Sequence, residues 1–217
     1  MPGPAQLRDY DALYREFRWN VPARYNIGVD ICDRWADVEP RRLSILYIRP
    51  DGREEKITYG TLRDTANRLA NVLRAQGVAR GDRVAIFMPQ APEVAAAHIA
   101  IYKLGAVALP IAILFGPDAL RYRLQNSGAK ALLTNAQGLG KFEEVRGEVP
   151  ETTCVISVDD NFAGLLGRAS SDFTAVDATT TWDSPRLDGL CPTWTVMPSS
   201  RSRLTLAFSE RSLPCTL

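Results

Sequence analysis

The sequence predicts a doubly wound α/β fold, a largely parallel sheet with helices on both of its faces. Short apolar stretches of the kind that form buried parallel strands alternate with helical stretches between residues 57 and 168. Glycine or proline stands at most of the boundaries between them. Because crossovers between parallel strands are right-handed, we expect the helices to cover both faces of the sheet.

Two short helices and a hairpin are predicted before this alternating region. Residues 10–17 and residues 31–38 each predict a short helix. Residues 44–49 alternate like a strand, and Asp51-Gly52 is a turn signal that precedes a short returning strand. The two strands are expected to form a β-hairpin.

Five helices and four strands are then predicted in turn. Leu62, Ala66, Leu69 and Leu73 recur at helical spacing, and Gly77 ends that helix. The other helices are predicted over residues 92–103, 117–126, 140–147 and 162–168. The strands are predicted over residues 83–88, 106–110, 130–134 and 153–158. Residues 1–177 are therefore assigned to one domain.

Residues 178–217 differ from this domain in composition. Of these forty residues thirteen are Ser or Thr, four are Arg and none is Lys. No helical or strand period persists, so we expect an aberrant, disordered tail. Flexible tails seldom carry two tryptophans, as this one does, and a shifted reading frame from about codon 178 is a second interpretation. The nucleotide sequence tests it.

The composition argues against several classes of protein. The 26 basic residues nearly cancel the 25 acidic ones, so no nucleic acid or membrane surface is indicated as a partner. No stretch reaches 18 apolar residues and the N-terminus lacks an apolar signal region, which favours a cytoplasmic protein. Four cysteines without CxxC spacing and a single histidine predict no metal site.

Several residues fit a structural role better than a catalytic one. The GLGK stretch at residues 138–141 fails the dinucleotide fingerprint at Glu143 and the P-loop pattern at Phe142, which disfavours an oxidoreductase and predicts a surface turn before a helix. His98 lies mid-helix among apolar residues, without a Ser/His/Asp constellation. Arg123 is expected to face water. We predict no catalytic residue.

Short motifs in the alternating region are specific through their order and spacing. They are Thr58-Tyr59, Gly81-Asp82-Arg83-Val84-Ala85, Met88-Pro89-Gln90, Tyr102-Lys103-Leu104-Gly105-Ala106-Val107 and Phe115-Gly116-Pro117-Asp118. With them, the stretch from Tyr10 to Val176 resembles the N-terminal part of the adenylate-forming acyl-CoA synthetases, above all the acetyl- and medium-chain acyl-CoA ligases. The resemblance implies an enzyme that joins a carboxylic acid to coenzyme A through an acyl-adenylate, with ATP and Mg²⁺.

The resemblance also suggests a coenzyme A site. Phe115 and Gly116 follow a predicted strand at the carboxyl-end rim, where such sheets bind ligands, although a helix entry with a packed phenylalanine fits equally well. Lys141 takes the place where related synthetases have basic residues near the coenzyme A phosphate. Phe115, Gly116 and Lys141 are therefore predicted to bind coenzyme A.

The chain departs from the family where the ATP phosphates bind. The family has a Ser/Thr/Gly-rich loop ending in lysine, but residues 179–185 read TTTWDSP, without glycine or lysine. Backbone amides and a lysine are what offset phosphate charge. We therefore expect a ligase fragment, cut short before this loop, that is inactive alone.

An alternative role is a non-catalytic module that binds coenzyme A or an acyl group, or that pairs with a full-length synthetase. A fragment of this kind is expected to expose an apolar face that the rest of the enzyme would cover, and to self-associate through it. A monomeric preparation with a sharp melting transition would contradict that expectation.

Overall fold

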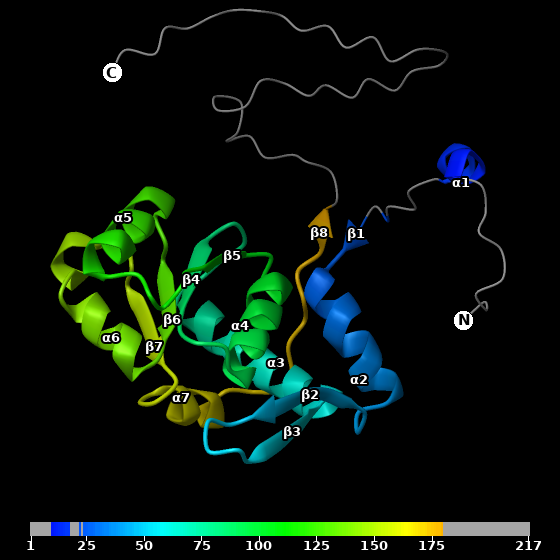
Figure 1. Ribbon diagram of the computed structural model, residues 1–217, viewed down its shortest axis with the longest axis horizontal. Helices are drawn as coiled ribbons and strands as arrows, with labels where there is room; N and C mark the ends of the chain where they lie inside the picture. Colours follow the sequence, from blue (N-terminus) through cyan, green and yellow to red (C-terminus); the bar gives the residue numbers. More distant parts are fainter. Residues whose placement is uncertain (1–9, 18–21, 23, 180–217) are drawn as a thin grey trace, which may run out of the picture. The chain divides into compact units, whose positions relative to one another are not determined.

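The computed structural model describes residues 10–17, 22 and 24–179, and it contains a four-stranded parallel sheet (Figure 1). The strands are β4 (Arg83–Phe87), β5 (Val107–Pro110), β6 (Ala131–Thr134) and β7 (Cys154–Ser157). They lie in the order β5-β4-β6-β7, and every neighbouring pair is parallel. The predicted fold class is confirmed.

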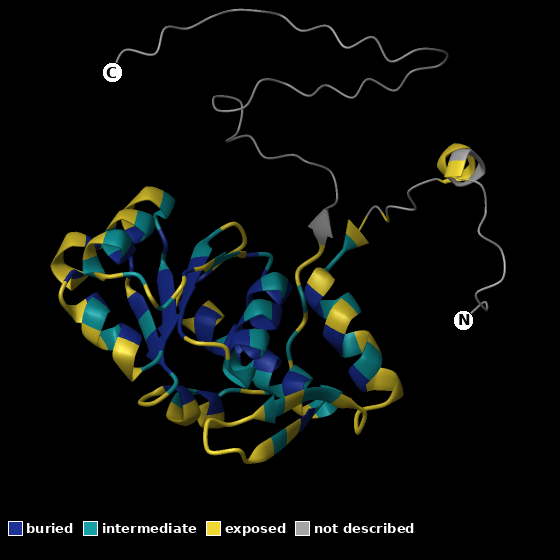
Figure 2. Ribbon diagram, in the orientation of Figure 1, coloured by how far each residue is buried: buried dark blue, intermediate teal, exposed yellow. Residues whose placement is uncertain are grey.

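The chain reverses its direction across the sheet at β4, and this reversal places helices on both faces. Helix α4 (Pro92–Lys103) joins β4 to β5, whereas α5 (Pro117–Ser127) and α6 (Ala136–Glu143) lead the other way, to β6 and β7. Because crossovers of this type are right-handed, the reversal moves α5 and α6 to the second face. Each face has its own apolar cluster, and β4, β6 and β7 are largely buried between them, whereas the edge strand β5 is not (Figure 2).

Two further helices, α3 (Tyr59–Ala75) and α7 (Phe162–Arg168), belong to the apolar cluster that contains α4. Thr58 caps the start of α3, where its side-chain oxygen accepts a hydrogen bond from the N–H of Thr61 at 3.2 Å. Gly77, with a φ of 84°, follows the end of α3 in the left-handed region that glycine adopts without strain.

The predicted hairpin consists of β2 (Leu43–Ile48) and β3 (Glu54–Thr58), which pair antiparallel. Its inner face packs on the larger apolar cluster through Ile45. On its outer face, Leu46 is 48% exposed and Ile48 is 62% exposed. An exposed apolar face of this kind is what self-association would require, and self-association stays a prediction.

The remaining elements are short. They are α1 (Tyr10–Glu16), β1 (Arg24–Tyr25), a π-helical turn (Val29–Asp33), α2 (Arg34–Val38), a 3₁₀ turn (Arg146–Glu148) and β8 (Ala178–Thr179), which pairs with β1. The chain divides into compact units of residues 1–181 and 182–217. The second unit lies outside the described residues, as does the predicted tail apart from β8, so the domain boundary, the disorder and the frame shift stay predictions. None of the described helices could cross a bilayer.

Helix α6 differs most from its predicted bounds. It begins at Ala136, not at residue 140, because Asn135 caps it: the Asn135 Oδ1 accepts a hydrogen bond from the N–H of Gly138 at 3.0 Å. The stretch 138–141 therefore lies inside the helix, and the predicted surface turn before a helix is wrong. Gly138 is buried, and a β-carbon there would stand 2.1 Å from the Thr134 Oγ1.

Candidate functional site

The carboxyl ends of the four strands form one rim, and the reversal between β4 and β6 makes that point the topological switch point, where such sheets bind ligands. A pocket of about 340 Å³ lies there, and its lining includes Met88, Asn135 and Asp159. Two of its polar side chains are already used within the protein, because Asn135 caps α6 and the Asp159 Oδ2 accepts a hydrogen bond from the N–H of Ala136 at 2.7 Å.

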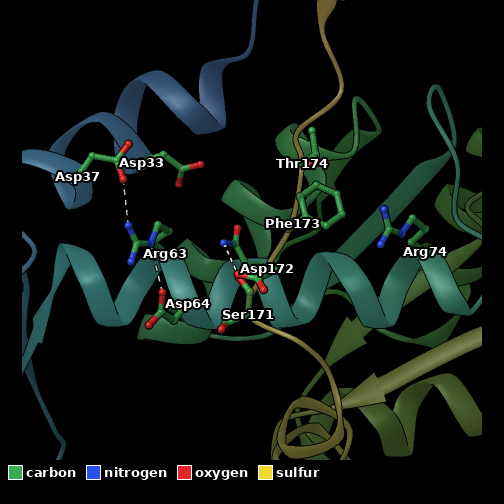
Figure 3. Close-up of a pocket in the computed structure, with 10 residues that line it drawn as sticks. Asp33, Asp37, Arg63, Asp64, Arg74, Ser171, Asp172, Phe173 and Thr174 are labelled. Carbon is green, nitrogen blue, oxygen red and sulfur yellow. Dashed lines mark hydrogen bonds and ion pairs between the residues drawn. The ribbon is translucent and has the colours of Figure 1, made fainter.

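A second pocket, of about 690 Å³, lies away from the rim, against α3 and residues 171–174 (Figure 3). Three of its charged side chains are paired with one another. Arg63 lies 3.0 Å from Asp37 and 3.1 Å from Asp64, measured between nitrogen and carboxylate oxygen. The amide nitrogen of Asn67 donates to the carbonyl oxygen of Ser171 at 2.8 Å. We interpret this pocket as a polar joint that ties other segments of the chain to α3.

The three residues predicted to bind coenzyme A come together at the β5 end of the rim. After β5 the chain makes a β-turn, in which the N–H of Phe115 donates to the carbonyl oxygen of Ala112 at 3.0 Å. The Lys141 ammonium, reaching from α6, donates to the carbonyl oxygens of Ile113 at 2.6 Å and of Phe115 at 3.0 Å. Gly116 follows directly. Their contact with coenzyme A stays a prediction.

Nothing in the fold requires a glycine at position 116. Its φ of −77° and ψ of 175° are open to any residue, and an added β-carbon would meet nothing within 4 Å. Gly116 is the N-cap of α5 but makes no side-chain cap, and Pro117 follows at the first helical position. The backbone here is therefore accessible to an approaching ligand, which is a common use of glycine.

Arg123 is a residue of this site that the sequence interpretation missed. Its guanidinium carbon lies 3.8 Å from the centroid of the Phe115 ring, and its Nη1 donates to the carbonyl oxygen of Ala119 at 2.9 Å. Arg123 is half-buried, so the expectation that it faces water is wrong. The spacing gave a signal for one of the two contacts, since Arg123 follows Ala119 by four residues, about one turn of α5.

The other candidates are structural. His98 is half-buried, its Nδ1 lies 3.1 Å from the Tyr102 hydroxyl, and burial lowers the pKa of its imidazole, as suits a structural histidine. Burial raises the pKa of the Cys32 and Cys154 thiols to about 11, which keeps them protonated. Within the described residues no group of three or more His, Cys, Asp or Glu side chains is placed to hold a metal.

A doubly wound sheet with an accessible loop at its carboxyl rim is the architecture of a ligand-binding α/β domain. Comparison with known proteins gives the family. The family model described as AMP-binding enzyme matches residues 32–191, about three quarters of the chain. The chain belongs to the family of AMP-binding enzymes. The place of the expected phosphate loop, residues 179–185, lies outside the described residues apart from Thr179.

Individual relatives agree with this family. The acetyl-coenzyme A synthetase of Bacillus subtilis (strain 168) is 31% identical in an alignment 179 residues long, and the match covers 73% of this chain and 31% of that protein. The acyl-CoA synthetase of Brucella canis superimposes with a TM-score of 0.66 at 26% identity, covering 80% of this chain and 34% of that one. The chain thus spans about a third of the length of these proteins.

A structure of the N-terminal domain of FACL13 from Mycobacterium tuberculosis has a TM-score of 0.64 at 32% identity, and the match covers 71% of this chain and 39% of that one. The family match and these similarities confirm the predicted resemblance to the N-terminal part of adenylate-forming acyl-CoA synthetases.

Proposed function

We propose that this chain provides the coenzyme A-binding part of an ATP-dependent carboxylate–CoA ligase. In this reaction the carboxylate attacks the α-phosphorus of ATP, which releases pyrophosphate and forms an acyl-adenylate. The thiol of coenzyme A then attacks the acyl carbon and releases AMP. Membership of the AMP-binding family and similarity to proteins named acetyl- and acyl-CoA synthetases support this proposal.

The observation that carries the proposal is the accessible backbone at Gly116 beside the cationic Lys141. An anionic ligand could approach this part of the rim without meeting a side chain at Gly116, and Lys141, which reaches the turn from α6, supplies positive charge beside it. Phe115 offers an apolar ring, already stacked on Arg123. These features suit a ligand that combines phosphates with an aromatic base, as coenzyme A does.

Replacing Gly116 by alanine tests this proposal. The free energy of unfolding is expected to change by less than about 1 kcal/mol, because the backbone conformation is allowed and the β-carbon meets open space. The stabilisation by coenzyme A, read as a rise in melting temperature across a titration, is expected to be largely lost. Gly164→Ala in α7, where a β-carbon also meets open space, is the matched control. An unchanged response to coenzyme A in Gly116→Ala would place the ligand elsewhere.

We also propose that these 217 residues do not form an acyl-adenylate alone. Adenylation depends on positioning and charge stabilisation of the triphosphate. The sequence at residues 179–185 contains neither the glycines nor the lysine that such a cradle needs. Carboxylate-dependent exchange of pyrophosphate into ATP is expected to stay at background with the purified chain, while a full-length acetyl-coenzyme A synthetase gives the positive control. Clear turnover by the chain would refute this expectation.

A non-catalytic role is the second candidate. The exposed outer face of the β2–β3 hairpin, with Leu46 and Ile48, favours pairing with another polypeptide such as a full-length synthetase. Neither candidate predicts stabilisation by ATP, so the two differ in their partner: pairing predicts that the chain co-elutes with a full-length synthetase, whereas a coenzyme A-binding part that does not pair elutes alone.

A further inference from the structure

We propose that Lys141 acts as a positioning residue, which holds the turn Ala112–Phe115 from α6 and does not serve as the ligand for a phosphate of coenzyme A. The inference rests on the proposed function, because it states how one residue of the proposed coenzyme A site acts. It differs from the role that the resemblance implies for Lys141, which is a basic residue near the coenzyme A phosphate.

The ammonium of Lys141 is committed to the turn. A lysine has three N–H donors, and two of them go to the carbonyl oxygens of Ile113 and Phe115 at 2.6 and 3.0 Å. The Nζ also lies 5.7 Å from the centroid of the Phe87 ring, within the range of a cation–π contact. Phe87 is completely buried at the end of β4, so the lysine joins the turn to a rigid part of the sheet.

The turn is held from two helices at once. Lys141 in α6 binds its carbonyl oxygens, while Arg123 in α5 stacks on the Phe115 ring at 3.8 Å. Gly116 is the next residue and the N-cap of α5. The position of the Gly116 backbone, where we place the ligand, therefore depends on the turn and hence on Lys141.

A phosphate would compete with these internal contacts. The phosphate could accept a hydrogen bond only from the third N–H of Lys141, unless the ammonium gave up its hydrogen bonds to the carbonyl oxygens. If it left them, the loop beside Gly116 would lose the hydrogen bonds that order it just when the ligand arrives. We therefore infer that Lys141 keeps the loop in its binding-competent state, and that its removal lowers the population of that state.

Lys141→Met tests this inference, because methionine is unbranched like lysine and only one atom shorter, and it removes the N–H donors. In the ligand-free protein, amide hydrogen exchange across residues 112–116 is expected to become about tenfold faster. Affinity is expected to fall by a similar factor, about tenfold, for coenzyme A and for 3′-dephospho-coenzyme A alike, because both need the same loop conformation. The ratio of the two dissociation constants stays that of the unmodified chain.

Lys130→Met is the matched control. Lys130 is also half-buried and also donates to a backbone carbonyl oxygen, that of Gly77 at 2.5 Å, as well as to Asp82 at 3.1 Å. It precedes β6, at the amino end of the sheet and away from the rim. Its replacement is expected to leave both the exchange of residues 112–116 and the two affinities unchanged.

A direct phosphate contact predicts a different result. A contact with the 3′-phosphate would make Lys141→Met weaken coenzyme A alone and bring its affinity toward that of 3′-dephospho-coenzyme A. A contact with the diphosphate, which both ligands carry, would weaken both alike. In either case the exchange of residues 112–116 would stay unchanged, and an unchanged exchange rate overturns the inference. If Lys141→Met does not fold, Lys141→Arg replaces it. Arginine keeps the charge for a phosphate, but its planar fork does not match the two carbonyl contacts, so faster exchange is again expected.

The proposed function and this inference can fail separately. If the unmodified chain binds neither ligand, the proposed function fails, and with it the role of Lys141 at a coenzyme A site. If it binds both ligands but Lys141→Met leaves the exchange of residues 112–116 unchanged, the coenzyme A site stands and the positioning role is refuted.

Discussion

Gly138→Ala is expected to destabilise the domain by about 2 to 4 kcal/mol, an unusually large effect for one methyl group in a helix. A β-carbon at Gly138 would stand 2.1 Å from the Thr134 Oγ1 and 2.7 Å from the carbonyl oxygen of Phe87. These two atoms are hydrogen-bonded to each other at 2.7 Å and belong to buried residues, so neither can move aside without breaking this hydrogen bond between β6 and β4. The measurement is the free energy of unfolding from urea titrations.

Gly140→Ala provides the control within the same helix. It lies two residues further along α6, and a β-carbon there meets nothing within 4 Å. Because alanine favours the helix over glycine by about 1 kcal/mol, this substitution is expected to raise the free energy of unfolding by up to that amount. The same substitution is thus expected to lower the free energy of unfolding at Gly138 and to raise it at Gly140. Equal effects at both would show that α6 does not pack on Phe87 in this way.

Most of the fold could be predicted because its signals are local. Pro92 and Gly105 bracket α4, and its predicted and observed bounds agree. The apolar residues of β4 indicate a buried strand without reference to the rest of the chain. The start of α6 was predicted four residues too far along the chain, because it depends on the cap at Asn135. Gly138 looks like a turn residue in the sequence, but a glycine is needed there because the helix packs closely on Phe87.

The site could be predicted only in part. Phe115 and Gly116 follow a strand and precede a helix, which indicates the carboxyl rim from sequence order alone. The contacts of Lys141 with the turn could not be predicted, because they join residues 28 and 26 positions apart and depend on how α6 packs on β4 and β6. Buried Lys103 was also missed, because lysine is among the residues that are almost never fully buried without a partner.

Lys103→Met is expected to destabilise the domain by about 3 to 5 kcal/mol. The Lys103 side chain is completely buried at the end of α4, where its ammonium pairs with the Asp33 carboxylate and donates to the Asn67 Oδ1 at 2.6 Å. Asp33, at the end of the π-helical turn, is only 19% exposed. Without the lysine, the poorly hydrated Asp33 carboxylate no longer has a cation that compensates for its charge. Urea denaturation measures the loss.

A second substitution distinguishes this electrostatic cause from a loss of packing. Because a complete buried ion pair contributes little compared with a neutral pair of similar volume, Lys103→Met together with Asp33→Asn is expected to recover most of the lost stability. If packing were the cause, the double variant would be as unstable as Lys103→Met. Lys56→Met, on the exposed face of the hairpin, is the control and is expected to change stability by less than about 0.5 kcal/mol. If Lys56→Met lowered the free energy of unfolding as much as Lys103→Met, the loss in Lys103→Met could not be attributed to its ion pair with Asp33, which joins α4 to the π-helical turn.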